Sequence, residues 1–563
     1  MLRQGTHRVG RAHDGVRHVH GVRESNHGVG GHIYSGGMTP SLRTQPRPQR
    51  PLALDEATVR RMSARVVASG PAQERMTPLT GETIGALPTS TPDDVVTAYE
   101  RARAAQQEWA QRDVRERVEF LTRLHDLVLD RQDELLDLIQ IESGKARIQA
   151  FEEVLDTAGV CRHYAKKAPS YLAERKALGA LPVLTQARTH YLPKGVVGIV
   201  APWNYPLSMS ITDALPALAA GNAVVLRPDE KSSFTCLRAV ELCDEAGLPE
   251  GLLQVVLGDG PNVGGAVLEH ADSVMFTGST KTGRIVARDA GERLKSASLE
   301  LGGKNAMYIA DDADLTRAAE CAQRAVFASA GQLCISIERL VVHEKIADEF
   351  LRRFLERVAA MKIGVALDWG YDMGSLISAD QLERVTQHVD DAVAKGATVL
   401  IGGKARSDIG PYCYEPTVLD GVADGMLCRD EETFGPVVSV YRVSSDDEAV
   451  ALANDTDFGL NASVWTKDVA RGRAIAARIR TGTVNVNEGY AAAYASNGAP
   501  MGGMKASGLG RRHGAEGITK YTDIQNVSVQ RLQGFGVPKG VSQRQFARAL
   551  STGLRVMKKA GLS

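Results

Sequence analysis

Three loops contain side chains that could take part in catalysis. Asn204 lies in the segment PWNYP, Glu300 begins the segment ELGGKN, and Cys334 ends the segment GQLC. An asparagine amide held between two prolines can stabilise a developing oxyanion, an effect typically worth about 3 kcal/mol. A single cysteine is more often a small core residue than a nucleophile, and a glutamate before two glycines is usually a cap or an ion-pair partner. Each loop alone therefore permits a structural reading.

Other loops contain glycines or carboxylates beside predicted strands. The segment FTGST (276–280) with Gly283 closes a strand and opens a helix, and GDG (258–260) with Gly264 follows another strand. Backbone N–H groups at a helix start, together with the helix dipole, favour a pyrophosphate. Neither segment has the G-x-G-x-x-G spacing, and such turns often need glycine for steric reasons alone. A further loop, EETFGP (431–436), carries two carboxylates.

Composition and missing motifs exclude several classes of protein. The chain has 67 Lys and Arg against 67 Asp and Glu, so no overall field attracts nucleic acid. No run of about eighteen apolar residues predicts an integral membrane segment. The seven cysteines form no C-x-x-C pair, which argues against a metal cluster and fits a reducing cytoplasm. G-x-S-x-G, P-loop and H-E-x-x-H motifs are also absent from the sequence, so hydrolase, NTPase and zincin readings lose support.

The elements that must position these loops alternate between strands and helices. After helices over 93–180, strands are predicted at 196–201, 223–226, 253–256 and 273–276, with helices at 207–220 and 234–246 between them. This order is typical of parallel βαβ units, whose ligands bind at the carboxyl ends of the strands. A second series has strands at 306–310 and 340–343, each followed by a helix, at 315–328 and 346–361. The sequence therefore predicts two α/β domains, and Cys334 follows a predicted helix.

Together the motifs resemble the aldehyde dehydrogenase superfamily over about residues 75–530. The matching segments are PWNYP, FTGSTKTG, ELGGKN, FASAGQLC, EETFGPVV and PMGGMKASGLGRRHG. The resemblance implies that Cys334 is the nucleophile, Asn204 the oxyanion donor and Glu300 the general base. A thiolate would add to an aldehyde, hydride would pass to NAD or NADP, and water activated by Glu300 would hydrolyse the thioester. Cys334 is then expected in a polar, electropositive setting, without a metal.

The resemblance also implies a cofactor site. Glu432 and Phe434 would hold the nicotinamide ribose, and Pro228 with Glu230 the adenosine ribose. A carboxylate at Glu230 would repel a 2′-phosphate, which favours NAD, whereas Arg227 could offset that repulsion and leaves NADP open. The full expected set is Pro202, Trp203, Arg227, Pro228, Glu230, Gly260, Gly264, Phe276, Gly278, Ser279, Gly283, Leu301, Glu432 and Phe434.

The substrate follows from a narrower resemblance. The stretches MGSLIS, HVDDAVAKGA, GGKARSDIGP and ANDTDFGLNASVW are similar to a bacterial subgroup named for succinate semialdehyde. Well-studied enzymes of that specificity carry arginines where this chain has Ala328 and Thr212, so an aliphatic or aromatic aldehyde is the alternative. Two other functions were considered. A CoA-acylating semialdehyde dehydrogenase usually lacks the glutamate at position 300, so Glu300 argues against it. A binding or structural protein that has lost its activity would not need Cys334, Glu300 and Asn204. Asp213 lies where many members of the family carry a lysine, and the sequence does not predict what this replacement does.

The family fold implies an aldehyde-dehydrogenase-like α/β architecture with two open parallel-sheet domains and a small oligomerisation strand element. We expect a dinucleotide-binding domain at 51–182 and 196–299, a catalytic domain at 300–500, and oligomerisation strands at 183–195 and 520–532, giving a homodimer or homotetramer. Residues 1–50 hold six of the thirteen histidines and predict a disordered leader, or translation that starts at Met38. The basic tail, 533–563, predicts a helix that packs on the body or on a neighbouring subunit rather than on a membrane.

Overall fold

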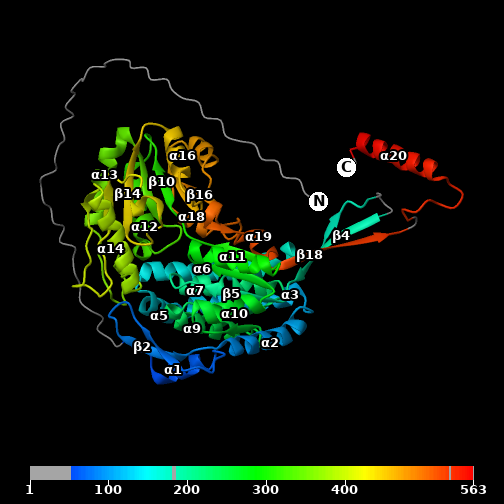
Figure 1. Ribbon diagram of the computed structural model, residues 1–563, viewed down its shortest axis with the longest axis horizontal. Coiled ribbons are helices and arrows are strands. Elements are labelled where there is room, and N and C mark those ends of the chain that lie inside the picture. Colours follow the sequence, from blue (N-terminus) through cyan, green and yellow to red (C-terminus); the bar gives the residue numbers. More distant parts are fainter. Residues whose placement is uncertain (1–51, 181–184, 532–533, 562–563) are drawn as a thin grey trace, which may run out of the picture. The chain divides into compact units, whose positions relative to one another are not determined.

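The computed structural model describes residues 52–180, 185–531 and 534–561, whose helices and strands are shown in Figure 1. Two large, mainly parallel sheets contain most of the strands, and a smaller antiparallel sheet joins two segments that are far apart in the chain. The predicted α/β class, with two open parallel sheets and an additional strand element, is confirmed. The predicted leader, residues 1–50, lies outside the described ranges.

The first large sheet has six strands in the order β17-β9-β8-β5-β6-β7. They are β5 (Val196–Ala201), β6 (Ala223–Pro228), β7 (Leu253–Val255), β8 (Ser273–Thr277), β9 (Ser296–Glu300) and β17 (Gly508–Leu509). Only β17 pairs antiparallel. Nearly every residue of β5 and β6 is buried, as expected for a parallel sheet with helices on both faces. The four strands predicted in this region are therefore confirmed.

Helices cover this sheet and connect its strands. They include α2 (Pro92–Trp109), α9 (Ser233–Glu245), α10 (Gly265–His270) and α11 (Thr280–Glu292). The single helix predicted over 207–220 is wrong, because α7 (Pro206–Ile211) and α8 (Ala214–Ala219) are separate. Pro216 has no N–H to donate to the carbonyl of Thr212, so a continuous helix would lose a bond there. Asp213, at the break, is buried.

The second large sheet has seven strands in the order β12-β13-β14-β11-β10-β15-β16. They are β10 (Asn305–Ile309), β11 (Ile337–His343), β12 (Thr398–Ile401), β13 (Thr417–Asp420), β14 (Val437–Val443), β15 (Asn461–Trp465) and β16 (Thr483–Val486). Only β12 pairs antiparallel. Its helices include α12 (Leu315–Phe327), α13 (Glu344–Ala359), α14 (Ala379–Ala394), α16 (Asp446–Asn454) and α17 (Val469–Ala476). The strand and helix pairs predicted after residue 300 are confirmed.

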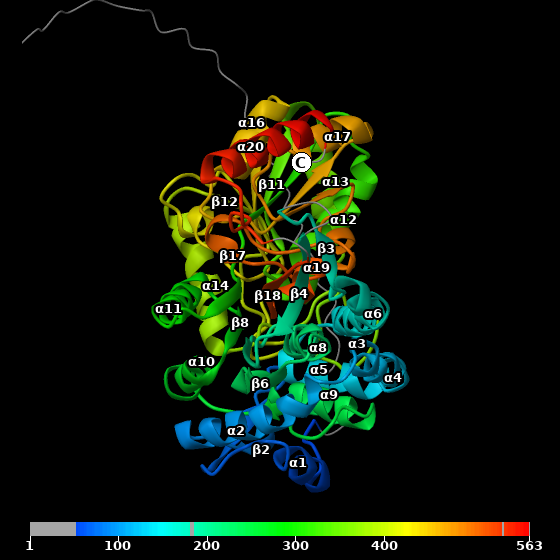
Figure 2. The ribbon, with the colours of Figure 1, turned by 90° about the vertical axis from the view of Figure 1, so that its right-hand side faces the viewer.

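The third sheet is antiparallel, in the order β18-β4-β3. It consists of β3 (Arg175–Ala177), β4 (Thr185–Pro193) and β18 (Thr522–Gln530), and Figure 2 shows β4 and β18 side by side. Thr522 pairs with Pro193 at one end and Gln530 with Thr185 at the other. Eight of the nine residues of β18 are exposed, so one edge of this sheet presents unpaired backbone groups.

The remaining elements frame these sheets. They are α1 (Glu56–Ser63), β1 (Ala72–Met76), β2 (Thr83–Pro88), α3 (Val114–Arg117), α4 (Glu119–Asp130), α5 (Gln132–Ser143), α6 (Arg147–Tyr171), α15 (Leu427–Asp430), α18 (Ala491–Tyr494), α19 (Gly514–Thr519) and α20 (Gln543–Lys559). The helices predicted over 93–180 are confirmed as far as Tyr171, after which the strand β3 follows, and the helix predicted in the tail is confirmed. Within the described ranges, no helix has the length and apolar character needed to cross a membrane.

Candidate active site

Cys334 lies in a turn between a short 3-10 segment, Ala328–Gly331, and β11. The sequence placed Cys334 after a helix over 315–328, and α12 ends at Phe327, within one residue of that prediction. The backbone then turns through the left-handed conformation at Ser329 (φ 52°) and Ala330 (φ 55°), which non-glycine residues rarely adopt. This strained turn ends the helical backbone before Cys334, so the cysteine lies in a loop and not on a helix face.

Hydrogen bonds from two asparagines hold the Cys334 loop. Nδ2 of Asn305 donates to the carbonyl oxygens of Cys334 (2.8 Å) and Ser336 (2.7 Å). Nδ2 of Asn204 donates to the carbonyl oxygen of Gln332 at 2.9 Å. A Cβ at Gly303 would lie 2.4 Å from the carbonyl oxygen of Cys334. Position 303 must therefore be glycine for the two loops to approach this closely. The three predicted catalytic loops therefore meet around Cys334.

A buried ion pair positions Asn204 from behind. Nζ of Lys145 donates to Oε1 of Glu153 and to the carbonyl oxygen of Asn204, both at 2.6 Å. Oε2 of Glu153 accepts the N–H groups of Leu207 (2.9 Å) and Ser208 (3.0 Å), which belong to the first turn of α7. Sequence reasoning missed Lys145 and Glu153, because a lysine and a glutamate eight residues apart form no recognisable motif.

Glu300 is the last residue of β9 and is buried at 4% exposure. Within the described part of the chain, its Oε1 has no hydrogen-bond partner. Burial raises the pKa of Glu300 to about 7, although the charges of Arg512 and Lys520 oppose the rise. A carboxylate with an unpaired oxygen and a pKa near neutrality suits a general base.

Three charged residues lie behind Glu300. The carboxylate of Asp213 is buried and is paired with the guanidinium of Arg512 and with Nζ of Lys520, the latter at 3.3 Å. Burial raises the pKa of Asp213, but these two cations outweigh it and hold the pKa below its usual range. Arg512 also donates to Oγ1 of Thr277 at 3.1 Å. Asp213 thus neutralises a cation that acts on Glu300.

The thiol of Cys334 is not in the electropositive setting expected from the sequence. Burial, then the charges of Glu432 and Glu300, raise its pKa to about 12, and Arg512 opposes them. With this pKa the sulfur carries its proton at neutral pH. All seven cysteines lie within the described ranges, and Cys334 alone among them is partly rather than fully buried.

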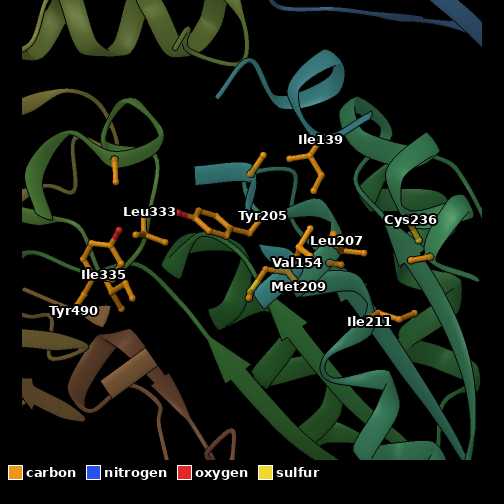
Figure 3. Close-up of a cluster of buried hydrophobic side chains, with 14 of the residues drawn as sticks. Ile139, Val154, Tyr205, Leu207, Met209, Ile211, Cys236, Leu333, Ile335 and Tyr490 are labelled. Carbon is orange, nitrogen blue, oxygen red and sulfur yellow. The ribbon is translucent and has the colours of Figure 1, made fainter. Parts of the chain in front are cut away.

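Leu333 and Ile335, the neighbours of Cys334 in the sequence, are buried in the main apolar core (Figure 3). Tyr205, Tyr490 and Met209 of α7 belong to the same core. Oγ of Ser329 donates to the hydroxyl of Tyr205 at 3.1 Å. Ala328 and Thr212, the two positions considered for binding a substrate carboxylate, are both buried, and the hydroxyl of Thr212 donates to the carbonyl of Ser208.

The predicted pyrophosphate and adenosine residues gather at the carboxyl ends of β6, β7 and β8. Pro228 ends β6, and Glu230 follows in a half-buried turn. Gly260 and Gly264 bound a short helical turn after β7. Phe276 lies in β8, Gly278 follows that strand, and Ser279 caps α11 by accepting the N–H of Thr282. A Cβ at Gly283 would lie 2.3 Å from Cδ2 of Leu301, so α11 packs closely there.

Arg227 has a different environment from the one proposed for it. Its Nε and Nη2 donate to the carbonyl oxygen of Gly258 at 2.9 and 2.5 Å. The guanidinium is therefore engaged in holding the loop after β7. A second arginine, Arg75 of β1, is buried, and within the described residues its Nε and Nη2 have no hydrogen-bond partner. Burial lowers the pKa of Arg75, and the negative charge of Glu230 opposes that change.

The predicted nicotinamide residues lie close to the catalytic loops. Oε1 of Glu432 accepts the N–H of Gly303 at 2.8 Å. The ring of Phe434 meets the Trp203 ring edge-on, with 5.5 Å between centroids. Glu338 is paired with Lys304 at 2.5 Å and accepts the N–H of Phe434 at 3.0 Å. This buried pair, which sequence reasoning missed, fixes the loop that carries Glu432.

Two other features lie apart from this site. A shallow hollow of about 890 Å³ runs along α14 and contains none of the predicted site residues. Among the described residues, no group of three His, Cys, Asp or Glu side chains could hold a metal ion.

Comparison with known proteins identifies the family. A profile described as "Aldehyde dehydrogenase family" matches residues 66–527. A Mycolicibacterium smegmatis protein named "Putative succinate-semialdehyde dehydrogenase [NADP(+)]" is 51% identical over 480 residues, which are 85% of this chain and 93% of that protein. A chloroplastic betaine aldehyde dehydrogenase of Amaranthus hypochondriacus is 39% identical over 461 residues, covering 80% and 91% of the two chains.

Solved structures agree with this result. An NAD-dependent aldehyde dehydrogenase from Sinorhizobium meliloti matches with a TM-score of 0.80 and 34% identity, over 84% of this chain and 94% of that chain. A betaine aldehyde dehydrogenase from Staphylococcus aureus in complex with NAD+ matches with a TM-score of 0.78 and 31% identity, over 84% of this chain and 94% of that chain. The profile, the sequence relatives and the shared fold together show that this chain is an aldehyde dehydrogenase, a member of the aldehyde dehydrogenase family.

Proposed function

We propose that this enzyme oxidises succinate semialdehyde to succinate with NADP or NAD, through a thiohemiacetal and a thioester on Cys334. One observation supports the mechanism most directly. The amide of Asn204 donates a hydrogen bond to the loop that carries Cys334. Glu300, a buried carboxylate with an unpaired oxygen, acts electrostatically on the sulfur of Cys334. Names of relatives support the substrate, since proteins with half of their residues identical are named for succinate semialdehyde and NADP(+).

The side chains divide the chemistry among them. Cys334 loses its proton to solvent and its thiolate then attacks the aldehyde carbon, so Glu300, with a pKa of about 7, remains ionised for the second half of the reaction. Nδ2 of Asn204 has two hydrogens, of which one binds Gln332, so the other is available to the oxyanion. In the second half of the reaction Glu300 takes a proton from the water that attacks the thioester, and Cys334 leaves as a thiolate.

The residues at the strand ends fit a nicotinamide dinucleotide. Glu432 and Glu230 provide carboxylate acceptors for ribose hydroxyls, and the start of α11 provides N–H groups for the diphosphate. A Cβ at Gly260 would meet no atom within 4 Å, so the backbone there is accessible. When bound, the cofactor accepts the hydride that leaves the aldehyde carbon. Arg75 reduces the repulsion that Glu230 would exert on a 2′-phosphate, so both cofactors are included in the proposal.

A second candidate substrate is an uncharged aliphatic or aromatic aldehyde. The observation that favours it is the apolar cluster of Tyr205, Met209, Leu333 and Tyr490, with Ala328 and Thr212 at the positions where a carboxylate would need cations. Arg324 lies 5.7 Å from the centroid of the Tyr490 ring, but it is paired with Glu488 at 2.5 Å.

A direct comparison of two aldehydes of equal chain length tests the substrate. We expect kcat/KM for succinate semialdehyde to exceed that for butanal by about tenfold or more, since a recognised carboxylate contributes at least about 1.4 kcal/mol. Equal values for the two aldehydes would assign the uncharged class instead. Each substrate is measured with both NAD and NADP, and Cys334→Ala is the control for non-enzymatic reduction of the cofactor.

We further propose a function for each region of the chain. Residues 51–182 and 196–299 bind the dinucleotide, 300–500 carry the nucleophile, and the strands at 183–195 and 520–532 join subunits into a cytoplasmic homodimer or homotetramer. The exposed edge of β18 supports this assembly, because a partner strand could satisfy its backbone groups. Light scattering on the purified protein tests it, and a monomer at micromolar concentration would contradict it.

A further inference from the structure

The C-terminal helix α20 has no partner within its own described chain. It comprises 17 residues, Gln543–Lys559, none of which is buried, and Leu554 is 61% exposed. A capping box between Ser542 and Gln545 defines its start. In proteins most of the stability of a helix comes from packing of its amphipathic face, so α20 needs a surface on which to pack.

The sequence of α20 separates apolar and cationic side chains onto two faces. At about 100° per residue, its cations fall within an arc of about 100°, and its large apolar residues within an arc of about 80° on the other side. The cations are Arg544, Arg548, Arg555, Lys558 and Lys559, and the apolar residues are Phe546, Leu550, Leu554 and Met557. The helix contains no acidic residue. A matching surface would therefore combine an apolar stripe with negative charges.

The hollow along α14 has these properties. Its α14 lining recurs every three or four residues from Ala379 to Ala394, so it follows the full length of that helix. Leu382, Tyr412 and Leu427 supply apolar lining, and Glu383 and Asp390 supply negative charge. Within the described ranges, neither Glu383 nor Asp390 forms an ion pair. At 1.5 Å per residue, the 16 residues of α14 and the 17 of α20 differ in length by only about 1.5 Å.

We infer that α20 of one subunit docks in the α14 groove of a second copy of this chain. Such an arrangement is a helix-in-groove contact, in which an apolar stripe enters the groove and charges on the rim select the partner. The occupant is assigned to a second copy because α20 buries no residue against its own chain. The contact is separate from the proposed active site and does not depend on the proposed reaction.

Crosslinking between two differently tagged full-length copies tests this inference. One copy carries Gln387→Cys on α14 and the other Ala547→Cys on α20, both in a Cys334→Ala background that removes the one thiol that is not fully buried. We expect a bismaleimide to link the two cysteines and so to give a product that carries both tags. The control copy carries Asp348→Cys on α13, where the side chain is fully exposed, and should give no linked product.

Two matched variants of α20 test the apolar stripe. Leu554→Glu should lower the yield of linked product about tenfold, because a charge would have to be buried in the groove. Val556→Glu should leave the yield unchanged, since Val556 is similarly exposed (59%) but lies outside the stripe. Equal yields for these variants, or for Gln387→Cys and Asp348→Cys, would overturn the inference. Linkage only within one copy would overturn the assignment to a second subunit, and α20-dependent binding to phosphatidylglycerol vesicles with no linkage would replace it with a lipid surface.

Discussion

Asp213 and Arg512 form a buried ion pair across 299 positions of the chain, and Arg512 acts electrostatically on both Glu300 and Cys334. Lys520 joins the same carboxylate at 3.3 Å. The negative charge of Asp213 raises the pKa of Glu300, whereas Arg512 and Lys520 lower it. The proton affinity of the proposed base is therefore set by a balance of charges that includes one carboxylate and two cations.

Replacement of Asp213 by asparagine shifts this balance. Asp213→Asn removes the anion and leaves Arg512 and Lys520 uncompensated, so the pKa of Glu300 should fall below its value of about 7. The rise of kcat with pH should then move to lower pH. The same variant should lower thermal stability, because breaking a buried pair costs about 3–5 kcal/mol. An unchanged pH profile in a folded Asp213→Asn protein would show that this pair does not act on the base.

Removal of the proposed base should separate the two halves of the reaction. Glu300→Gln should still produce one rapid burst of reduced cofactor per active site, followed by steady turnover slowed by about 10²–10⁴-fold, because thioester hydrolysis loses its base. In the parent enzyme kcat should rise through pH 7 as Glu300 loses its proton. Stopped-flow absorbance measures both phases. A steady rate equal to that of the parent enzyme would count against this role.

The reactivity of Cys334 should depend on Glu432. Because the charge of Glu432 raises the pKa of the Cys334 thiol, Glu432→Gln should lower that pKa and speed alkylation by iodoacetamide at pH 8. A fall of one pKa unit would give about tenfold more thiolate. Mass spectrometry locates the adduct, and Cys334→Ala is the control. Slower alkylation in Glu432→Gln would contradict the proposed electrostatic effect.

Cofactor preference should respond to Glu230 and Arg75 in opposite directions. Glu230→Ser removes the anion that repels a 2′-phosphate, so the ratio of kcat/KM for NADP to that for NAD should rise, by roughly tenfold for about 1.4 kcal/mol. Arg75→Met should lower the same ratio, since the charge that offsets Glu230 is lost. Melting temperatures show whether the Arg75 variant is folded. A ratio unchanged in both folded variants would remove these residues from the adenosine site.

Local sequence patterns predicted much of the fold. The apolar run at 196–201 is the strand β5 without change, and Ser279 caps α11 directly after β8 as expected for a strand-to-helix turn. Strands and caps of this kind depend on neighbouring residues, which a linear sequence shows directly. The motifs taken together likewise indicated the aldehyde dehydrogenase family, which the family profile confirms.

Tertiary structure decided the features that depend on distant segments. The helix over 207–220 divides at Asp213, whose partner Arg512 lies in a part of the chain that no local pattern links to it. At the thiol of Cys334 the charges of Glu432 and Glu300 each act more strongly than that of Arg512, and these three residues lie far apart in the sequence. Burial and the charges of distant residues control these pKa values, and both quantities exist only after the chain has folded.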